Sequence, residues 1–428
     1  MPGQLACPGG ALEPADRPGE PGAHARCASR ELAEESGIKI APEDWIAAGE
    51  RITPPLFPQR FRTRFFLARL PATVAAEALR PASGENESLL LARPDELLGQ
   101  WERGAAELPP PVLAILRALA EVKDLSPEQA APRVAAENAR EERAPRIEFA
   151  PGVWVLPVRT ATLPPATHTN VWLPGLRHFV LIDPGSTEVE ELRRLGDVVE
   201  RRRALGHRPA AVLLTHHHGD HAAGARLVCE RFGLPLAAHR ETLDALGALA
   251  AGLDGRPLAD GETVELEGLT LRALHTPGHA RGHLAFHVAE RGWLFAGDLA
   301  SGLSTILIDP ADGDMDAYLT SLARVEALGC RLLFPGHGPP LAAHRIGALI
   351  AHRIERERRI AAALAPEDAS LADLAAVAYA DGPGLPAPLV ARQTLAHLLR
   401  LERQGRAERA DPQATQWRLT RRGRTVPD

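Results

Sequence analysis

Four histidines and one aspartate lie within six consecutive residues, and both side-chain types are metal ligands. The stretch His216-His217-His218-Gly219-Asp220-His221 directly follows the apolar run 210–214. Neutral imidazoles and carboxylates suit zinc and iron. In an extended turn His216 and His218 point to one side and His217 to the other, so we assign His217 a structural or ligand-supporting role. An incidental polar loop is the alternative, and the density of histidine argues against it.

Three further residues supply what a metal site of this kind still lacks. His279 lies in the turn of the segment 275–283, HTPGHARGH, directly after an apolar run. Asp298 ends the run 293–298, WLFAGD, and His337 lies in the glycine turn of 334–340, FPGHGPP. Each residue alone is more often an ordinary hydrogen-bonding group. In this order, downstream of the histidine-rich stretch, they predict a site for two metals.

Two metals would make the site hydrolytic. Two cations roughly 3.5–4 Å apart lower the pKa of a bridging water, so that hydroxide attacks a carbonyl or phosphorus centre. Asp220 is the candidate to orient this nucleophile and handle its proton, and it is also a ligand. His283, four residues after His279, either contacts the substrate or serves as a structural hydrogen-bonding histidine.

The elements that position these residues follow from the pattern of the chain. At 428 residues the chain is too long for one core and should contain two or three domains. Over 146–345, short apolar strands alternate with amphipathic helices, which indicates an α/β fold whose ligands follow strand ends. We expect a first domain over 1–122, a polar linker that is partly helical over 123–145, and a mainly helical domain over 346–428.

The segment 146–345 resembles the metallo-β-lactamase superfamily through THHHGDH, HTPGH, the strand-ending Asp298 and PGH. The resemblance implies an αββα sandwich with the site along one edge. It also implies that Asp183, in LIDPGS, orients a ligand histidine. One metal would be held by His216, His218 and His279, the other by Asp220, His221 and His337, with Asp298 bridging.

Asp298 narrows the expected class of substrate. In this superfamily the zinc β-lactamases usually carry cysteine at that position, whereas hydroxyacylglutathione hydrolases and nucleases carry a bridging aspartate. We therefore expect cleavage of an ester or thioester in a small-molecule substrate, with single-stranded RNA as the alternative. Zinc is the expected metal, and iron or manganese would suit the same ligands.

The last segment adds a further resemblance. Helical patterns cover 346–364, 371–379 and 389–404, and two short strands end at 416–419, which suggests a winged-helix-like unit. His352, Arg353, Arg356 and Glu357 match a helix of the β-lactamase-like protein 2 family, whose mammalian members are described as endoribonucleases. Because acidic residues alternate with the arginines and aromatic residues are scarce, we favour a scaffold or cleft wall over nucleic-acid binding.

The first segment resembles a Nudix domain. After Pro8-Gly9-Gly10, the helix beginning Arg30-Glu31 matches the helical half of a Nudix box. Its carboxylates, Glu31, Glu34 and Glu35, share one face and form a candidate Mg²⁺ site for diphosphate hydrolysis. The usual glutamate eight positions before Arg30 is replaced by Gly22. We therefore expect a Nudix-like fold that is truncated or has lost its activity.

Composition and charge exclude other classes. A net charge of −6 argues against a protein coated with basic residues for duplex DNA. The sequence has neither an apolar run of about 20 residues nor a signal-peptide pattern at its start, so we expect a cytoplasmic protein without a membrane partner. The four scattered cysteines form no CxxC pair and suggest reduced thiols.

Overall fold

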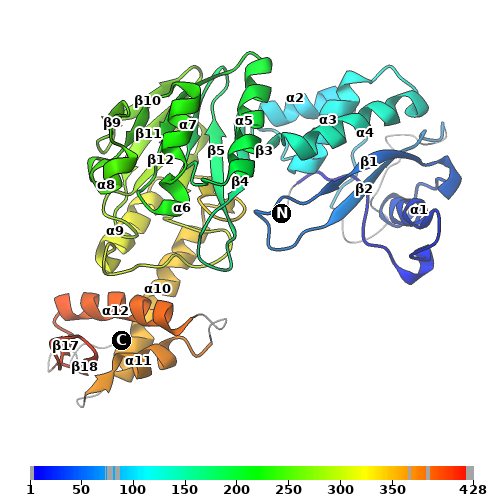
Figure 1. The fold of residues 1–428 in the computed structure, drawn as a ribbon. Coiled ribbons are helices and arrows are strands. Elements are labelled where there is room, and N and C mark those ends of the chain that lie inside the picture. The colour runs from blue at the N-terminus through cyan, green and yellow to red at the C-terminus, as the bar shows by residue number, and fades with distance from the viewer. Residues whose placement is uncertain are drawn as a thin grey trace. The chain divides into compact units, whose positions relative to one another are not determined.

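The computed structural model describes residues 4–72, 74, 81, 87–364, 368–381 and 386–420 (Figure 1). The chain divides into two compact units. The first comprises Met1–Pro54, Gln59–Val155 and Arg194–Arg201, and the second comprises Pro55–Pro58, Leu156–Arg193 and Arg202–Asp428. Each described helix falls short of the combined length and hydropathy that a membrane span requires.

The first unit is built around an antiparallel pair of strands, β1 (Ile46–Ile52) and β2 (Arg62–Leu67). Gly49 of β1 has a φ of +98°, and a Cβ there would lie 3.2 Å from the Cα of Ala135. Glycine therefore lets a helix approach this strand closely. The other elements of the unit are η1 (Pro14–Asp16), α1 (Ala23–Ser36), η2 (Pro42–Asp44), α2 (Pro94–Glu102), α3 (Pro110–Glu121), α4 (Pro127–Arg143) and β3 (Ile147–Ala150).

Helix α4 occupies the segment that the sequence led us to expect as a linker. The helix begins at a capping box between Ser126 and Gln129, and its Ala131 and Val134 are fully buried. Asn138 donates a hydrogen bond of 2.8 Å to the carbonyl of Ala48 in β1. Alanine favours helix and buries with little loss of side-chain entropy, so a stretch poor in large apolar residues still packs here.

Two sheets form the layers that carry the candidate ligands. Trp172 of β5 (His168–Pro174) packs edge-on against Phe334 of β14 (Leu332–Pro335), with ring centroids 4.9 Å apart. It also packs against Phe295 of β13 (Trp293–Gly297). These contacts place an aromatic core between the sheets. The first sheet has the order β3-β4-β5-β6-β7-β8-β9. Its strands are β3, β4 (Val153–Arg159), β5 (His168–Pro174), β6 (His178–Ile182), β7 (Arg208–Leu213), β8 (Leu236–Ala238) and β9 (Gly255–Pro257).

The second sheet has the order β10-β11-β12-β13-β14-β15, and β13 and β14 run parallel within it. Its strands are β10 (Thr263–Leu266), β11 (Leu269–His275), β12 (Leu284–Val288), β13 (Trp293–Gly297), β14 (Leu332–Pro335) and β15 (Leu341–Ala342). The helical elements that connect strands of the two sheets are α5 (Val189–Ala204), α6 (Gly219–Ala222), α7 (Ala225–Phe232), α8 (Arg240–Leu246), η4 (Gly247–Leu249), η5 (Ala289–Arg291) and α9 (Met315–Glu326).

The end of the described chain has its own small core. Trp417, Leu398 and Ile360 are fully buried together there. The elements expected from the sequence are present within a few residues of their predicted bounds, and the winged-helix interpretation stays a prediction. They are α10 (Arg345–Ala363), β16 (Ala369–Ser370), α11 (Leu371–Ala378), α12 (Ala387–Arg403), β17 (Ala407–Arg409) and β18 (Gln416–Leu419), with sheet order β16-β18-β17.

Candidate metal centre

The segments that follow strands β7, β11, β13 and β14 carry the seven predicted ligands, five in loops and two in the short helix α6 (Gly219–Ala222). The chain leaves β7 at Leu213 and turns into the short helix α6, for which His218 is the N-cap residue. Asp220 and His221 lie in α6 itself. The turn is compact because a neighbouring loop contacts it closely: a Cβ on Gly185 would lie 1.6 Å from the carbonyl oxygen of Asp220.

The structure brings the seven residues together as two adjoining groups. We call His216, His218 and His279 the first group, in which each pair of ring centroids is 4.6 to 4.9 Å apart. We call Asp220, His221 and His337 the second group. There the Nε2 atoms of His221 and His337 are 3.1 Å apart, and an Asp220 oxygen lies 3.4 Å from His337 Nε2.

Asp298 lies between the two groups. Its Oδ2 is 3.6 Å from His279 Nε2 in the first group. Its Oδ1 is 3.4 Å from His221 Nε2 and 3.5 Å from His337 Nε2 in the second. One carboxylate thus presents one oxygen to each group, which is the arrangement that a bridging ligand requires.

Three buried atoms in this cluster have no hydrogen-bond partner and are suited to bind metal ions. His216 Nε2, His279 Nε2 and Asp298 Oδ1 are buried and have no hydrogen-bond partner. Leaving a buried polar atom without a partner costs about 1–3 kcal/mol, so such atoms are rare in folded proteins. Three of them converge here among imidazoles and carboxylates whose ligand atoms lie within 4.8 Å of one another in each group. The donor set therefore fits divalent transition metals.

Hydrogen bonds on the outer side of three rings orient them toward the centre. The Nδ1 of His279 donates to the carbonyl of Leu307 at 2.8 Å, and that of His337 donates to the carbonyl of His168 at 2.9 Å. His221 Nδ1 lies 2.9 Å from Asp183 Oδ2. With Nδ1 protonated, each ring keeps the lone pair of Nε2 for a metal.

Asp183 supports the second group as the sequence predicted. It has a left-handed backbone conformation, with φ of 56°, and a fully buried carboxylate. Besides its contact with His221, this carboxylate accepts hydrogen bonds from the backbone N–H and the hydroxyl of Thr215, at 2.8 and 2.6 Å. It therefore ties the end of β7 to the ligand-bearing helix α6.

The two groups differ in electrostatics when no cation is bound. In the first group, burial lowers the pKa of His279 to about 4 and places that of His216 well below its usual value. In the second, burial would lower the pKa of His337, but Asp298 and a hydrogen bond to Asp220 raise it to about 9. The second group thus holds a proton that a metal would displace.

His283 lies inside the protein, where its ring is not exposed to a substrate. Its imidazole is fully buried. The Nδ1 faces the hydroxyl of Thr276 at 2.9 Å, and the Nε2 accepts a hydrogen bond of 3.1 Å from the backbone N–H of Asp298. Burial lowers the pKa of His283 to about 3, so the ring stays neutral. Of the two roles expected for His283, these contacts favour the structural hydrogen-bonding one, in which the ring holds the backbone of Asp298, over substrate contact.

Asp312 is a neighbour of the site that the sequence analysis missed. Its Oδ2 lies 3.3 Å from His218 Nε2 and 3.6 Å from His217 Nε2. Both rings therefore face one carboxylate, which is consistent with a supporting role for His217. The acidic stretch 309–316 before α9 was the available signal, but its spacing gives no hint of which carboxylate reaches the histidines.

The candidate Nudix carboxylates contact other groups of the first unit. Arg30 contacts Glu31 and Glu34, each at 2.9 Å, while Glu35 accepts a hydrogen bond from the backbone of Gly9. In the described part of the chain these three glutamates do not form a group with ligand atoms in metal-binding reach. The buried Asp16 also pairs with Arg30, at 3.0 Å. The Mg²⁺ site stays a prediction.

Comparison with known proteins agrees with this geometry. Residues 163–337 match the model of the metallo-beta-lactamase superfamily, so the chain contains a domain of that superfamily. A metallo-beta-lactamase family protein from Thermus thermophilus has a similar structure, with a TM-score of 0.53 and 26% identity. The match covers 64% of this chain and 100% of that one. The predicted α/β metallo-β-lactamase fold is confirmed.

Three curated proteins are similar over part of the chain. Lactamase-like protein adaB of Aspergillus niger is 34% identical over 46% of this chain and 58% of its own length. The beta-lactamase-like protein 2 homolog of Drosophila melanogaster is 29% identical, covering 56% and 83%. An atrochrysone carboxyl ACP thioesterase of Aspergillus fumigatus is 31% identical, covering 40% and 37%. The chain thus spans little more than half the length of the first of these relatives, and the family supports a metal-dependent hydrolase.

Proposed function

We propose that this protein is a hydrolase with two metal ions that cleaves an ester or thioester, of the hydroxyacylglutathione-hydrolase type. The observation that carries the proposal is Asp298, whose two carboxylate oxygens face separate groups of candidate ligands. A closed structural zinc site is four-coordinate and has no use for seven ligands. The thioesterase name of one relative supports acyl transfer to water as the reaction.

Each residue of the centre has a defined task in this proposal. When bound, two divalent cations lower the pKa of water and polarise the scissile carbonyl. The three histidines of the first group hold one cation and those of the second group hold the other, together with Asp220. The carboxylate of Asp220 is partly exposed, so it can also accept the proton of the attacking water. We expect zinc, with iron or manganese as alternatives.

Three arginines of the C-terminal helices favour a small-molecule substrate over RNA. Arg353 and Arg356 of α10 are buried, and Arg353 donates to a backbone carbonyl. Arg400 of α12 pairs with the buried Glu357 and with Asp316. Guanidinium groups engaged inside the protein cannot neutralise phosphates, on which RNA affinity depends. Single-stranded RNA therefore stays the second candidate.

A substrate panel tests the proposal. Zinc-loaded full-length protein should hydrolyse S-acyl glutathione or acyl-CoA and leave single-stranded RNA intact. Asp220→Asn should lower kcat/KM about 10²–10⁴-fold, the usual contribution of general base catalysis. Asp254→Asn, which changes an exposed carboxylate outside both groups, should match the wild type. Removal of the metals by a chelator should abolish turnover, and zinc should restore it.

Two outcomes would contradict the proposal. Chelator-sensitive RNA cleavage without acyl hydrolysis would favour the endoribonuclease alternative. Full acyl hydrolysis after chelation, or in Asp220→Asn, would show that the reaction takes place at another site.

A further inference from the structure

The strongest unexplained feature is the irregular segment 306–308, in which each residue has a backbone hydrogen bond to a side chain from another part of the chain. The carbonyl of Ile306 accepts from the guanidinium of Arg353. The carbonyl of Leu307 accepts from His279 Nδ1 at 2.8 Å, and the N–H of Ile308 donates to Gln393 Oε1 at 2.9 Å. Three consecutive residues thus connect a candidate metal ligand to α10 and α12, two helices of the group of elements from α10 to β18, which we call the C-terminal module.

Both helical side chains are placed to fix this segment. Arg353 of α10 is 2% exposed and Gln393 of α12 is 5% exposed, so water cannot replace either hydrogen bond. Ile306 and Ile308 are themselves buried. A buried loop without regular structure depends on such bonds for its position, because its own backbone groups lack partners within a helix or sheet.

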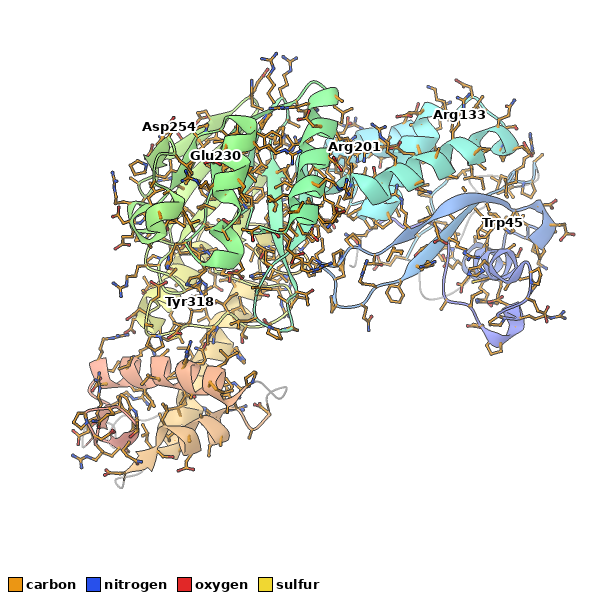
Figure 2. The ribbon with its side chains drawn as sticks, viewed as in Figure 1. Trp45, Arg133, Arg201, Glu230, Asp254 and Tyr318 are labelled. Carbon is orange, nitrogen blue, oxygen red and sulfur yellow. The ribbon has the colours of Figure 1, made fainter. Side chains whose placement is uncertain are left out.

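A second contact of Arg353 reaches the other side of the centre. Its guanidinium lies 5.3 Å from the ring centroid of Tyr318 on α9, which Figure 2 labels. The Tyr318 hydroxyl donates a 2.9 Å hydrogen bond to the carbonyl of Leu299, the residue after Asp298. The backbone of Tyr318 also contacts Gly278, where a Cβ would lie 2.3 Å from its Cα. The residues that flank His279 and Asp298 therefore rest on the same tyrosine.

We propose that Gln393 and Arg353 are positioning residues of the metal centre, acting through the carbonyl of Leu307 on His279. The C-terminal module then helps to hold His279 of the first group in position. This inference rests on the proposed function only in taking His279 as a metal ligand. Hydrogen-bond partners of ligand histidines set ring orientation and basicity, and losing one typically costs about 10–100-fold in metal affinity.

The test replaces the acceptor on α12 and keeps its volume. Gln393→Met removes the oxygen that holds the N–H of Ile308, whereas Gln393→Glu keeps an oxygen at that position. Arg392→Met is the matched control, because it alters an exposed ion pair with Asp309 on the neighbouring position of the same helix. Each full-length variant is titrated with Co²⁺ against a competing chelator, and the absorption spectrum of each bound Co²⁺ is recorded.

We expect Gln393→Met to weaken one of two Co²⁺ affinities about 10-fold and to alter the spectrum of that ion. The affinity of Gln393→Met for the other Co²⁺ ion should stay within about twofold of the wild type. In Gln393→Glu and Arg392→Met, both Co²⁺ affinities should stay within about twofold of the wild type. Unchanged affinities and spectra in Gln393→Met would overturn the inference. So would an equal loss of both affinities, since that indicates general destabilisation.

The titration is independent of the substrate. If the wild type binds two Co²⁺ ions but hydrolyses no acyl substrate, the proposed function fails, and the Gln393 variants still decide the positioning role. If the wild type hydrolyses acyl thioesters and Gln393→Met binds both ions normally, the positioning role alone fails.

Discussion

Replacing Asp298 by alanine is expected to reduce the protein from two bound metals to at most one and to lower kcat/KM by about 10³-fold or more. The carboxylate presents one oxygen to each group, at 3.6 Å from His279 and 3.4 Å from His221. Bound metals supply several kcal/mol of transition-state stabilisation, and each 1.4 kcal/mol is about tenfold in rate. Metal content by mass spectrometry and steady-state kinetics on an acyl thioester measure both effects.

Asp298→Asn is the companion variant. It keeps the shape of the side chain and the backbone N–H that donates to His283, but it removes the negative charge. We expect it to lose metal nearly as completely as the alanine variant, because the negative charge of Asp298 offsets the repulsion between two adjacent cations. Two metals and normal turnover in either variant would show that Asp298 does not bridge.

A single added methyl group at Gly185 is expected to cost about 3 kcal/mol of stability, the upper end of the usual cost of overpacking, and to displace the second group. The new Cβ would lie 1.6 Å from the backbone oxygen of Asp220 and 2.9 Å from the backbone nitrogen of His221. Backbone atoms cannot swing aside as a flexible side chain does, so either the 183–186 loop or α6 must move. Gly185→Ala should therefore lower the urea midpoint and the metal content together.

Gly219→Ala provides the control for stability. Gly219 lies between the ligands His218 and Asp220, yet a Cβ there would meet no atom within 4 Å. Its free energy of unfolding should stay within about 1 kcal/mol of the wild type. Equal unfolding midpoints for Gly185→Ala and wild type would contradict the close contact between loop and helix.

The candidate ligands were predictable because sequence places them locally. His216, His218 and His221 lie in one run, and Asp298 and His337 each follow an apolar strand, where α/β sheets place their chemistry. Their meeting point depends on how two sheets pack, and resemblance to a known family supplied that information. The structure then placed the seven in overlapping groups of three, whose ligand atoms lie within 4.8 Å of one another in each group.

Residues that act through long-range contacts could not be predicted in the same way. Gln393 accepts a hydrogen bond from the backbone N–H of Ile308, 85 residues earlier in the chain. Nothing in its helix distinguishes it from an ordinary core glutamine. His283 resembled a substrate-contacting residue because it follows a ligand turn. Only the packing of β12 against β13 shows that its ring is enclosed by Thr276 and Asp298.

The first unit marks where composition misled the prediction. Charged residues and the scarcity of large apolar groups suggested a linker, whereas Ala131 and Val134 of α4 are buried against the strands. In the same unit, Asp16 forms an ion pair with Arg30 from 14 residues upstream, a contact that local spacing in the sequence did not indicate. Patterns of large apolar residues miss small residues that are buried, and local spacing does not reveal contacts between residues far apart in the chain.

The most direct test of the central claim is to locate metal ions in zinc-loaded crystals of the full-length protein by anomalous diffraction. We predict two peaks in each chain, one among His216, His218 and His279 and one among Asp220, His221 and His337, with Asp298 contacting both. A single peak, or two peaks of which neither contacts Asp298, would contradict the claim that this domain is a two-metal hydrolase.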